Sequence, residues 1–209
     1  MQKKVYNLII LDESGSMAAI ASPVVSGLME QLQQISIEAK DEMLEQWVNF
    51  YSFNGEGIKE LLPIQKVLPG QTFSLDKYQP ESMTPLYDAI GYSVNKIRYE
   101  LEGKSDWEVL VSIFTDGAEN ASKEYTGSTI ANMIKKLSGE GWTFTYRGAN
   151  HDVEETAAKL NISEVKRFYS DSESVNKLMD DEMVFRKAYY SRIRIDSKEK
   201  PDNEDIPFK

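Results

Sequence analysis

Hydrophobic residues along this chain form either short continuous runs or helical spacings. Residues 5–11 make a nearly unbroken apolar run that ends at Asp12, and residues 109–114 make a second run that ends before Thr115. Such runs are typical of strands that are buried on both faces, as in a parallel sheet covered by helices. Further strands are expected over residues 46–53, 58–64, 142–146 and 165–169.

A turn and a proline indicate how two of these strands pair. The segment Asn54-Gly55-Glu56-Gly57 lies between residues 46–53 and residues 58–64, which predicts a hairpin. Proline cannot donate a backbone hydrogen bond to a neighbouring strand, so Pro63 places the second strand of this hairpin at a sheet edge. Residues 66–83 are expected to form a loop with no more than one short strand.

Helical spacing is clearest in the middle of the chain. Apolar residues there step by four, four, three and four positions: Leu86, Ile90, Val94, Ile97 and Leu101. This spacing predicts an amphipathic helix. Further helices are expected over residues 22–41, 130–137, 153–160 and 174–191.

Strands that alternate with helices predict an α/β fold. We expect a doubly wound, mostly parallel central sheet with one antiparallel edge strand and helices on both faces. The chain has 209 residues, which suits one domain of ordinary size. We assign residues 1–195 to that domain and residues 196–209 to a charged, flexible C-terminal tail.

Composition and charge exclude several classes of partner. The net charge is −10, which disfavours nucleic acid and anionic membranes as partners. No apolar run reaches the roughly 18 residues of a transmembrane helix. The basic start Met1-Gln2-Lys3-Lys4 leads into an apolar stretch, but Asn7 and Asp12 interrupt it too early for a signal peptide. There are no cysteines for disulfides or a thiolate metal site. We therefore expect a cytoplasmic chain that is monomeric on its own.

The candidate chemistry begins where the first strand ends. Asp12, Ser14 and Ser16 follow it, with Gly15 between the serines. Oxygen ligands suit hard cations such as Mg²⁺, Ca²⁺ or Mn²⁺, but one acid and two hydroxyls are too few to hold such an ion. Further oxygen ligands are therefore expected at the ends of other strands, where ligands of open α/β sheets bind.

Two later segments supply such oxygens. Thr84 precedes a helix that Pro85 can open, and Asp116-Gly117 follows the strand at residues 109–114. The three segments together resemble the metal-ion-dependent adhesion site of the von Willebrand factor A domain family. Its pattern is Asp-x-Ser-x-Ser, then a Thr commonly followed by Pro-Leu, then an Asp commonly followed by Gly. The resemblance extends over residues 5–191, because the order of strands and helices also fits.

The resemblance implies a role for each residue of the site. Ser14 and Ser16 would coordinate the cation directly, and Thr84 would do so directly or through water. Asp12 and Asp116 would hold waters and orient the hydroxyls. Neutral hydroxyls leave the ion affinity for one more anion, so a Glu or Asp of a partner protein would complete its coordination. The expected ion is Mg²⁺, with Mn²⁺ or Ca²⁺ as alternatives; Ca²⁺ is less favoured because it prefers more ligands and more carboxylates.

Each segment also has a purely structural interpretation. Asp12 could begin a turn, the serines and Thr84 could cap helices, and Asp116-Gly117 could be a turn pair. These interpretations would have to hold together, in the order of the family pattern. Glu13 is expected to point outward near the metal and to influence the choice of partner. Residues 148–152 also follow a strand on the site face; we expect a turn into the next helix, with shaping of the rim or contact with a partner as the alternative, and no catalytic role for His151.

An enzyme is the main alternative from another class. Phosphatases with an aspartate nucleophile need a second acid two residues later, where this chain has Ser14. The chain also lacks a nucleophile elbow and a glycine-rich phosphate loop. We therefore expect a metal-dependent protein-binding module that is not an enzyme. A magnesium-dependent phosphatase-like hydrolase and a metal-free scaffold domain remain the alternatives.

Overall fold

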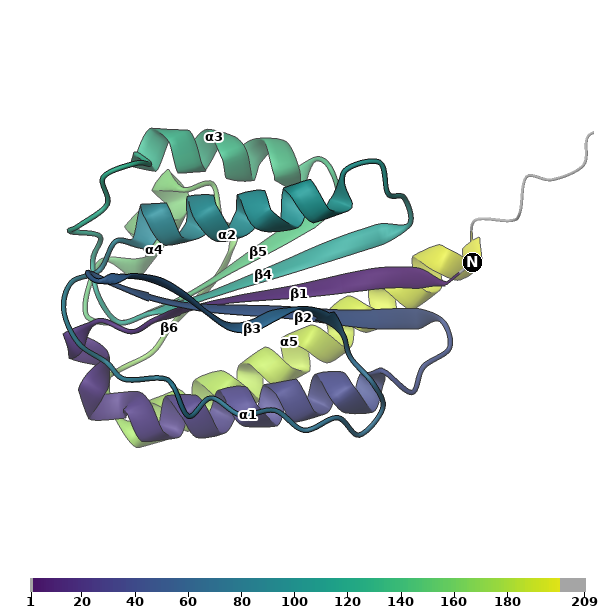
Figure 1. Ribbon diagram of the computed structural model, residues 1–209, viewed down its shortest axis with the longest axis horizontal. Helices are drawn as coiled ribbons and strands as arrows, with labels where there is room; N and C mark the ends of the chain where they lie inside the picture. The colour runs from purple at the N-terminus through teal and green to yellow at the C-terminus, as the bar shows by residue number, and fades with distance from the viewer. Residues whose placement is uncertain (1, 200–209) are drawn as a thin grey trace, which may run out of the picture.

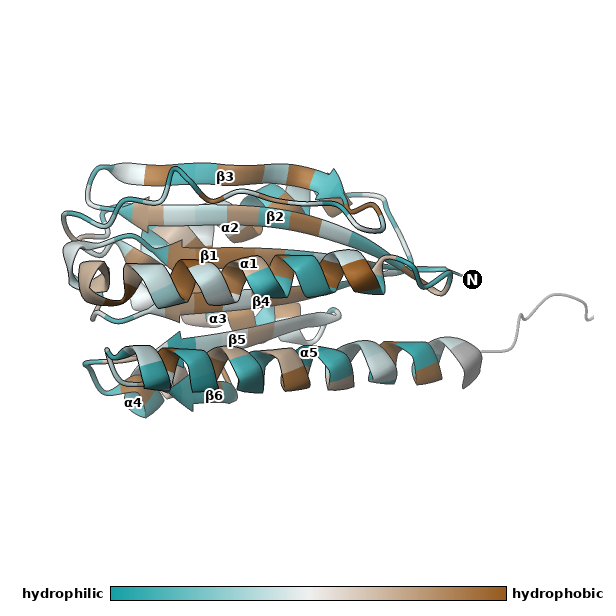
Figure 2. Cartoon of the chain, turned by 90° about the horizontal axis from the view of Figure 1, so that it is seen from below, coloured by the Kyte–Doolittle hydropathy of each residue, from teal (hydrophilic) through white to brown (hydrophobic). Residues whose placement is uncertain are grey.

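A sheet of six strands runs through the middle of the computed structural model, which describes residues 2–199. Its strand order is β3-β2-β1-β4-β5-β6 (Figures 1 and 2). The strands are β1 (Lys3–Asp12), β2 (Leu44–Asn54), β3 (Gly57–Lys66), β4 (Trp107–Thr115), β5 (Trp142–Gly148) and β6 (Glu164–Arg167). All neighbouring pairs are parallel except β2 with β3, which is antiparallel and leaves β3 at an edge. The expected fold class and the edge position of Pro63 are thus confirmed.

Helices cover both faces of this sheet. In Figure 1, α2 (Leu86–Leu101), α3 (Gly127–Ser138) and α4 (Val153–Lys159) lie above it. The short 3₁₀ helix η1 (Gly15–Ile20) leads into α1 (Ala21–Glu38), which lies below the sheet with α5 (Ser172–Glu199). Figure 2 shows α1 and α5 side by side across that face. No helix within residues 2–199 is both long and apolar enough to cross a membrane.

The sheet separates two main apolar cores, and β1 contributes to both. Tyr6, Leu8 and Ile10 pack into the core between the sheet and α2 and α3, whereas Ile9 and Leu11 pack into the core between the sheet and α1. Successive side chains of a strand point to opposite faces, so a strand buried on both faces must be apolar at nearly every position. This explains the continuous apolar run in the sequence.

The final helix is longer than the hydrophobic pattern predicts, whereas the segment before α2 is a loop as expected. The final helix extends beyond residues 174–191 at both ends and includes residues 196–199, which we had assigned to the tail. Arg194 forms ion pairs with Glu38 and Asp41, which hold this part of α5 against the end of α1. Residues 200–209 lie outside the described part of the chain. Residues 67–85 contain no strand or helix, although Val67, Leu75 and Tyr78 are buried.

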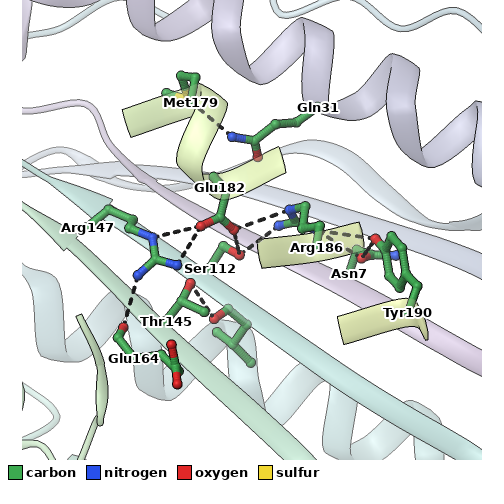
Figure 3. A network of polar contacts seen from close by, with 11 residues as sticks. Asn7, Gln31, Ser112, Thr145, Arg147, Glu164, Met179, Glu182, Arg186 and Tyr190 are labelled. Atoms are coloured by element: carbon green, nitrogen blue, oxygen red, sulfur yellow. Dashed lines mark hydrogen bonds and ion pairs between the residues drawn. The ribbon is translucent and has the colours of Figure 1, made fainter. Parts of the chain in front are cut away.

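A buried polar network joins α5 to the centre of the sheet (Figure 3). Glu182 pairs with Arg147 of β5 at 2.6 Å and with Arg186 one helical turn away at 3.3 Å. Arg186 also donates to Ser112 Oγ of β4 and to Asn7 Oδ1 of β1. The three charged side chains are 0–3% exposed. Among residues 2–199, Glu182 is the one carboxylate that pairs with these two arginines, so the position of α5 depends strongly on it.

We expect Glu182→Gln to lower the free energy of unfolding by about 3–5 kcal/mol, because it leaves buried arginine charges without a counter-ion. Chemical denaturation monitored by circular dichroism measures this loss. The matched control is Glu155→Gln, which removes one half of an exposed pair with Lys159 on α4 and should leave the unfolding transition nearly unchanged. Equal transitions for the two variants would show that the network contributes little.

Candidate metal centre

The candidate residues gather at the point where the strand order reverses direction. From β1 the chain continues to β2 on one side of the sheet, and β4 lies on the other side. Asp12 is the last residue of β1, and Asp116 directly follows β4. The carboxyl ends of two adjacent parallel strands therefore present their acids to the same crevice, which is where open α/β sheets bind ligands.

Hydroxyl and carboxylate oxygens make direct contacts in this crevice. The Oγ atoms of Ser14 and Ser16 lie 3.2 Å apart. Ser16 Oγ donates a hydrogen bond of 2.5 Å to Asp116 Oδ1. The loop after β1 and the loop after β4 are thus joined through side-chain oxygens. The structure brings together three residues of the pattern that are up to 102 positions apart in the sequence.

Asp12 holds the base of the site. Its Oδ1 accepts from the backbone N–H of Ser14 at 2.7 Å, and its Oδ2 accepts from Thr115 Oγ1 at 2.6 Å. Burial raises the pKa of Asp12 from 3.8 to about 6, although both hydrogen bonds favour the charged form. Burial also raises the pKa of Asp116. Neither carboxylate forms an ion pair with Lys or Arg in the described part of the chain.

Thr84 reaches the same place from a third loop. A Cβ atom built on Gly117 would lie 3.2 Å from Thr84 Oγ1 and 3.7 Å from Ser16 Oγ, so these hydroxyls meet above Gly117. The Thr84 N–H donates to Asn120 Oδ1 at 2.9 Å, and the Asn120 N–H donates to the Thr84 carbonyl at 3.2 Å. These two bonds attach the Thr84 loop to the loop after β4.

The structure does not support the interpretation of these hydroxyls as helix caps. Ser14 is in the N-cap position of η1, and its side chain makes no capping hydrogen bond. The N-cap of α2 is Pro85, which has no side-chain acceptor, so Thr84 does not cap that helix either. The hydroxyls of Ser14, Ser16 and Thr84 instead lie next to two buried carboxylates.

This set of oxygens fits a small, hard cation. Two carboxylates and three hydroxyls converge, whereas no three His, Cys, Asp or Glu side chains within residues 2–199 gather into a metal-binding group. Oxygen-only ligands favour Mg²⁺, Mn²⁺ or Ca²⁺ over metals that prefer nitrogen or sulfur. A divalent ion would also offset the cost of burying the negative charges of Asp12 and Asp116. Ligation by the five predicted residues remains a prediction.

Glu13 does not point outward as we expected. It is 0% exposed and accepts hydrogen bonds from Ser52 Oγ of β2 and from the Gln79 N–H, and it pairs with Lys59 of β3 at 3.2 Å. The Glu13 N–H donates to the Phe53 carbonyl, so residue 13 still lies beside β2. Its side chain is enclosed between β2, β3 and residue 79. Ser52 is a buried hydroxyl in a strand rich in aromatics, but its contact with Glu13 spans 39 positions and no local pattern predicts it.

The segment of residues 78–82 braces the loop after β1. Tyr78 donates from its hydroxyl to the Asp12 carbonyl at 2.8 Å. The Glu81 N–H donates to the Glu13 carbonyl, and the Gly15 N–H donates to the Ser82 carbonyl. These bonds keep the serine loop in place, and we did not predict them because the segment has no periodic pattern.

Asn150 is a further polar residue at the rim, in the segment for which shaping the rim was the alternative to a simple turn. It has a positive φ of 59°, and its Nδ2 donates to Ser170 Oγ at 2.7 Å and approaches Asp116 Oδ2 at 3.5 Å. The ring of His151 turns the other way. Its Nε2 contacts the Tyr146 hydroxyl at 3.0 Å and its Nδ1 contacts the Ala149 carbonyl at 2.5 Å. The histidine thus has a structural role in this turn.

We expect Asp12→Asn to stabilise the protein in the presence of chelator. The pKa rise from 3.8 to about 6 means that the ionised carboxylate costs as much as about 3 kcal/mol above pH 6, and this cost disappears below the unfolded-state pKa. An asparagine can accept from the Ser14 N–H and donate to Thr115 Oγ1, so both contacts survive.

Denaturation of wild type and Asp12→Asn at pH 7.5 and pH 4 in chelator measures this effect. The variant should be more stable at pH 7.5, and the difference should shrink at pH 4. A variant that is less stable than wild type at both pH values would contradict it.

Comparisons with known proteins bear on the fold. No family model matches the chain, and no curated protein matches it in sequence. Among solved structures, proximal thread matrix protein 1 from the mussel byssus with a zinc-occupied MIDAS motif superposes with a TM-score of 0.56 at 15% identity. The alignment covers 86% of this chain and 45% of that protein, so this chain spans less than half of its length.

Two further structures give similar superpositions. The SpRpn10 VWA domain has a TM-score of 0.54 at 8% identity, and the alignment covers 87% of this chain and 95% of that domain. The manganese-loaded Plasmodium vivax TRAP protein has a TM-score of 0.50 at 16% identity, with 85% of this chain and 72% of that protein covered. At these identities the likeness concerns the architecture of the chain. Its strand order, helix layers and crevice are those of the von Willebrand factor A domain fold.

Proposed function

We propose that this protein is a metal-dependent protein-binding module. A divalent cation, Mg²⁺ by preference, is held by Ser14, Ser16 and Thr84, with Asp12 and Asp116 orienting the hydroxyls and bound waters. The observation that carries this proposal is the convergence of three loops on one crevice, with hydroxyls that cap no helix beside two buried carboxylates. A metal ion gives these side chains a common partner.

The donor set explains why the bound ion would seek a further ligand. Three of its five side chains are neutral hydroxyls, which leave the ion with residual positive charge. A carboxylate from outside the chain, Glu or Asp of a partner protein, would complete the coordination and neutralise this charge. Two structures with the same fold carry zinc and manganese, which supports a divalent ion at this position. The few carboxylates favour Mg²⁺ or Mn²⁺ over Ca²⁺.

Hydrolysis has little support from the geometry. Ser14 occupies the position at which an aspartate-nucleophile phosphatase has its general acid. His151 is turned toward Tyr146 and Ala149 rather than toward either serine hydroxyl. We therefore propose binding without turnover, and a generic phosphate ester incubated with the Mg²⁺-loaded protein should remain intact.

The first test is thermal unfolding of wild type and of Ser14→Ala/Ser16→Ala, in chelator and with Mg²⁺ or Mn²⁺ up to about 10 mM. An ion present at about a hundred times its dissociation constant stabilises the folded protein by about 2.7 kcal/mol. We expect the wild-type transition to rise with metal and the variant transition not to respond.

The matched control is Ser128→Ala/Ser191→Ala, which removes two exposed helical hydroxyls and should respond to metal like wild type. Equal curves for wild type and the Ser14/Ser16 variant, with and without an added acidic peptide, would exclude the metal-binding function. The metal-free scaffold would then become the better description.

A second test uses the close approach at Gly117. In Gly117→Ala the new methyl group would lie 3.2 Å from Thr84 Oγ1, so the hydroxyl must shift by a few tenths of an ångström. We expect metal affinity to fall by about tenfold or more while the chelator-treated protein unfolds much as wild type. Gly139→Ala at the end of α3, where the nearest atom would be 3.4 Å away, is the control. Unchanged metal affinity in Gly117→Ala, measured by calorimetry, would remove Thr84 from the proposed site.

A further inference from the structure

A pocket of about 350 Å³ opens directly beside the candidate metal centre. The β2–β3 turn, the residues around Thr84, the first turns of α2 and the loop at residues 121–125 form its walls. Met83 and Pro85, the two neighbours of Thr84 in the chain, both line it. Neighbouring Cα atoms are about 3.8 Å apart, so one extended segment can reach both the metal ligand and this pocket.

The walls of this pocket are preformed. A Cβ on Gly55 would lie 2.4 Å from Ser82 Oγ and 3.0 Å from the Met83 nitrogen, so the β2–β3 turn packs tightly against the Thr84 loop. On the other side, the Asp88 carboxylate accepts from the backbone N–H groups of residues 123–125 at 2.8–3.0 Å. A pocket with fixed walls binds a side chain without the entropy cost of ordering loops.

The pocket presents apolar surface to solvent. Met83 is 56% exposed, and Tyr92, which lies edge-on to Tyr51, is 43% exposed. Pro85 and Ile58 add to this lining. Exposed large hydrophobic side chains that gather in a concave site beside polar groups are typical of a binding surface.

Two polar features indicate the chemistry of the occupant. Asn54 is 0% exposed and its Oδ1 accepts from the Glu56 N–H, yet its Nδ2 has no hydrogen-bond partner. Because this Nδ2 is buried in the pocket wall, a carbonyl group of an occupant such as a peptide can accept from it only if the Asn54 side chain turns toward the pocket. Three exposed charged side chains line the rim: Glu56, Glu124 and Lys123, which together carry a net negative charge. Asp88 is not counted, because its oxygens already accept from backbone N–H groups. This charge favours a basic residue over additional acids in the segment that binds.

We propose that the pocket binds a large apolar side chain from the same partner segment whose Glu or Asp completes the metal coordination. This inference rests on the proposed function of the metal centre. The partner segment is extended, with the apolar residue one to three positions from the acid and with Lys or Arg near Glu56 and Glu124. The metal provides affinity for any carboxylate, and the pocket selects among acidic segments.

The test uses short blocked peptides and the Mg²⁺-loaded full chain. Each peptide contains one Glu, one Arg and either Leu or Phe placed one, two or three residues from the Glu. Its control peptide has Ser in place of the apolar residue. Dissociation constants come from NMR titration of the ¹⁵N-labelled protein. We expect at least one apolar peptide to bind about tenfold or more tightly than its Ser counterpart, with a shift of the Asn54 side-chain amide signal.

Two tyrosines on α2 provide matched variants. Tyr92→Ser changes the pocket, whereas Tyr99→Ser changes an 80% exposed tyrosine two turns further along the same helix. The apolar preference should vanish in Tyr92→Ser and persist in Tyr99→Ser. Met83→Ser, a more exposed position, repeats the test in case Tyr92→Ser lowers the thermal stability. Metal affinity should be unchanged in all three variants.

The outcomes separate the two proposals. Metal-dependent binding of acidic peptides without any apolar preference, or with a preference that Tyr92→Ser and Met83→Ser leave intact, would overturn the pocket and leave the metal centre standing. If metal does not stabilise wild type and chelator does not affect peptide binding, the metal centre is overturned and this inference with it.

Discussion

The parallel pairing of β1 with both β2 and β4 is the constraint on which the rest of the structure depends. It buries β1 on both faces and places the ends of β1 and β4 side by side at the reversal of strand order. Asp12 and Asp116 therefore lie near each other because main-chain hydrogen bonds pair β1 with β4 along the preceding residues. Burial of two acids at this position is costly, and the surrounding hydroxyls and N–H groups offset only part of that cost.

The three loops that carry the candidate metal ligands are joined to one another by hydrogen bonds. Ser16 joins the loop after β1 to Asp116, Asn120 joins the loop after β4 to Thr84, and Ser82 returns to Gly15. These contacts form a closed ring of segments that are far apart in the sequence. A shift in one loop must therefore be transmitted to the other two, which keeps the oxygens at fixed separations.

Most of the fold was predictable from local patterns, because burial on one or two faces leaves a period in the sequence. The apolar run of β1 and the steps of Leu86 to Leu101 are examples. The proximity of the five candidate residues was also predictable, because each follows a strand or precedes a helix; that they hold a metal ion stays a prediction. The contacts of Glu13 and Asn150 were not predictable, because they join segments that are far apart in the sequence. The side chain of Glu13 is buried by β2, β3 and residues 78–82, which no local pattern indicates. The length of α5 was underestimated because its last turns are mostly polar and are held by the ion pairs of Arg194 with Glu38 and Asp41, which no local pattern indicates.

The spacing of the polar side chains that α5 turns toward the sheet has a consequence for the register of this helix. Glu182, Arg186 and Tyr190 are four residues apart, so a shift of the helix by four residues, about 6 Å, would bring one of them to the place of the next. In one direction Arg186 would then face Arg147, and two buried cations would repel each other. In the other direction Leu178 would replace Glu182 and leave Arg147 without a counter-ion. The order of these side chains along α5 therefore fixes the longitudinal position of the helix on the sheet. A rearrangement of the helix would have to break these ion pairs and hydrogen bonds together.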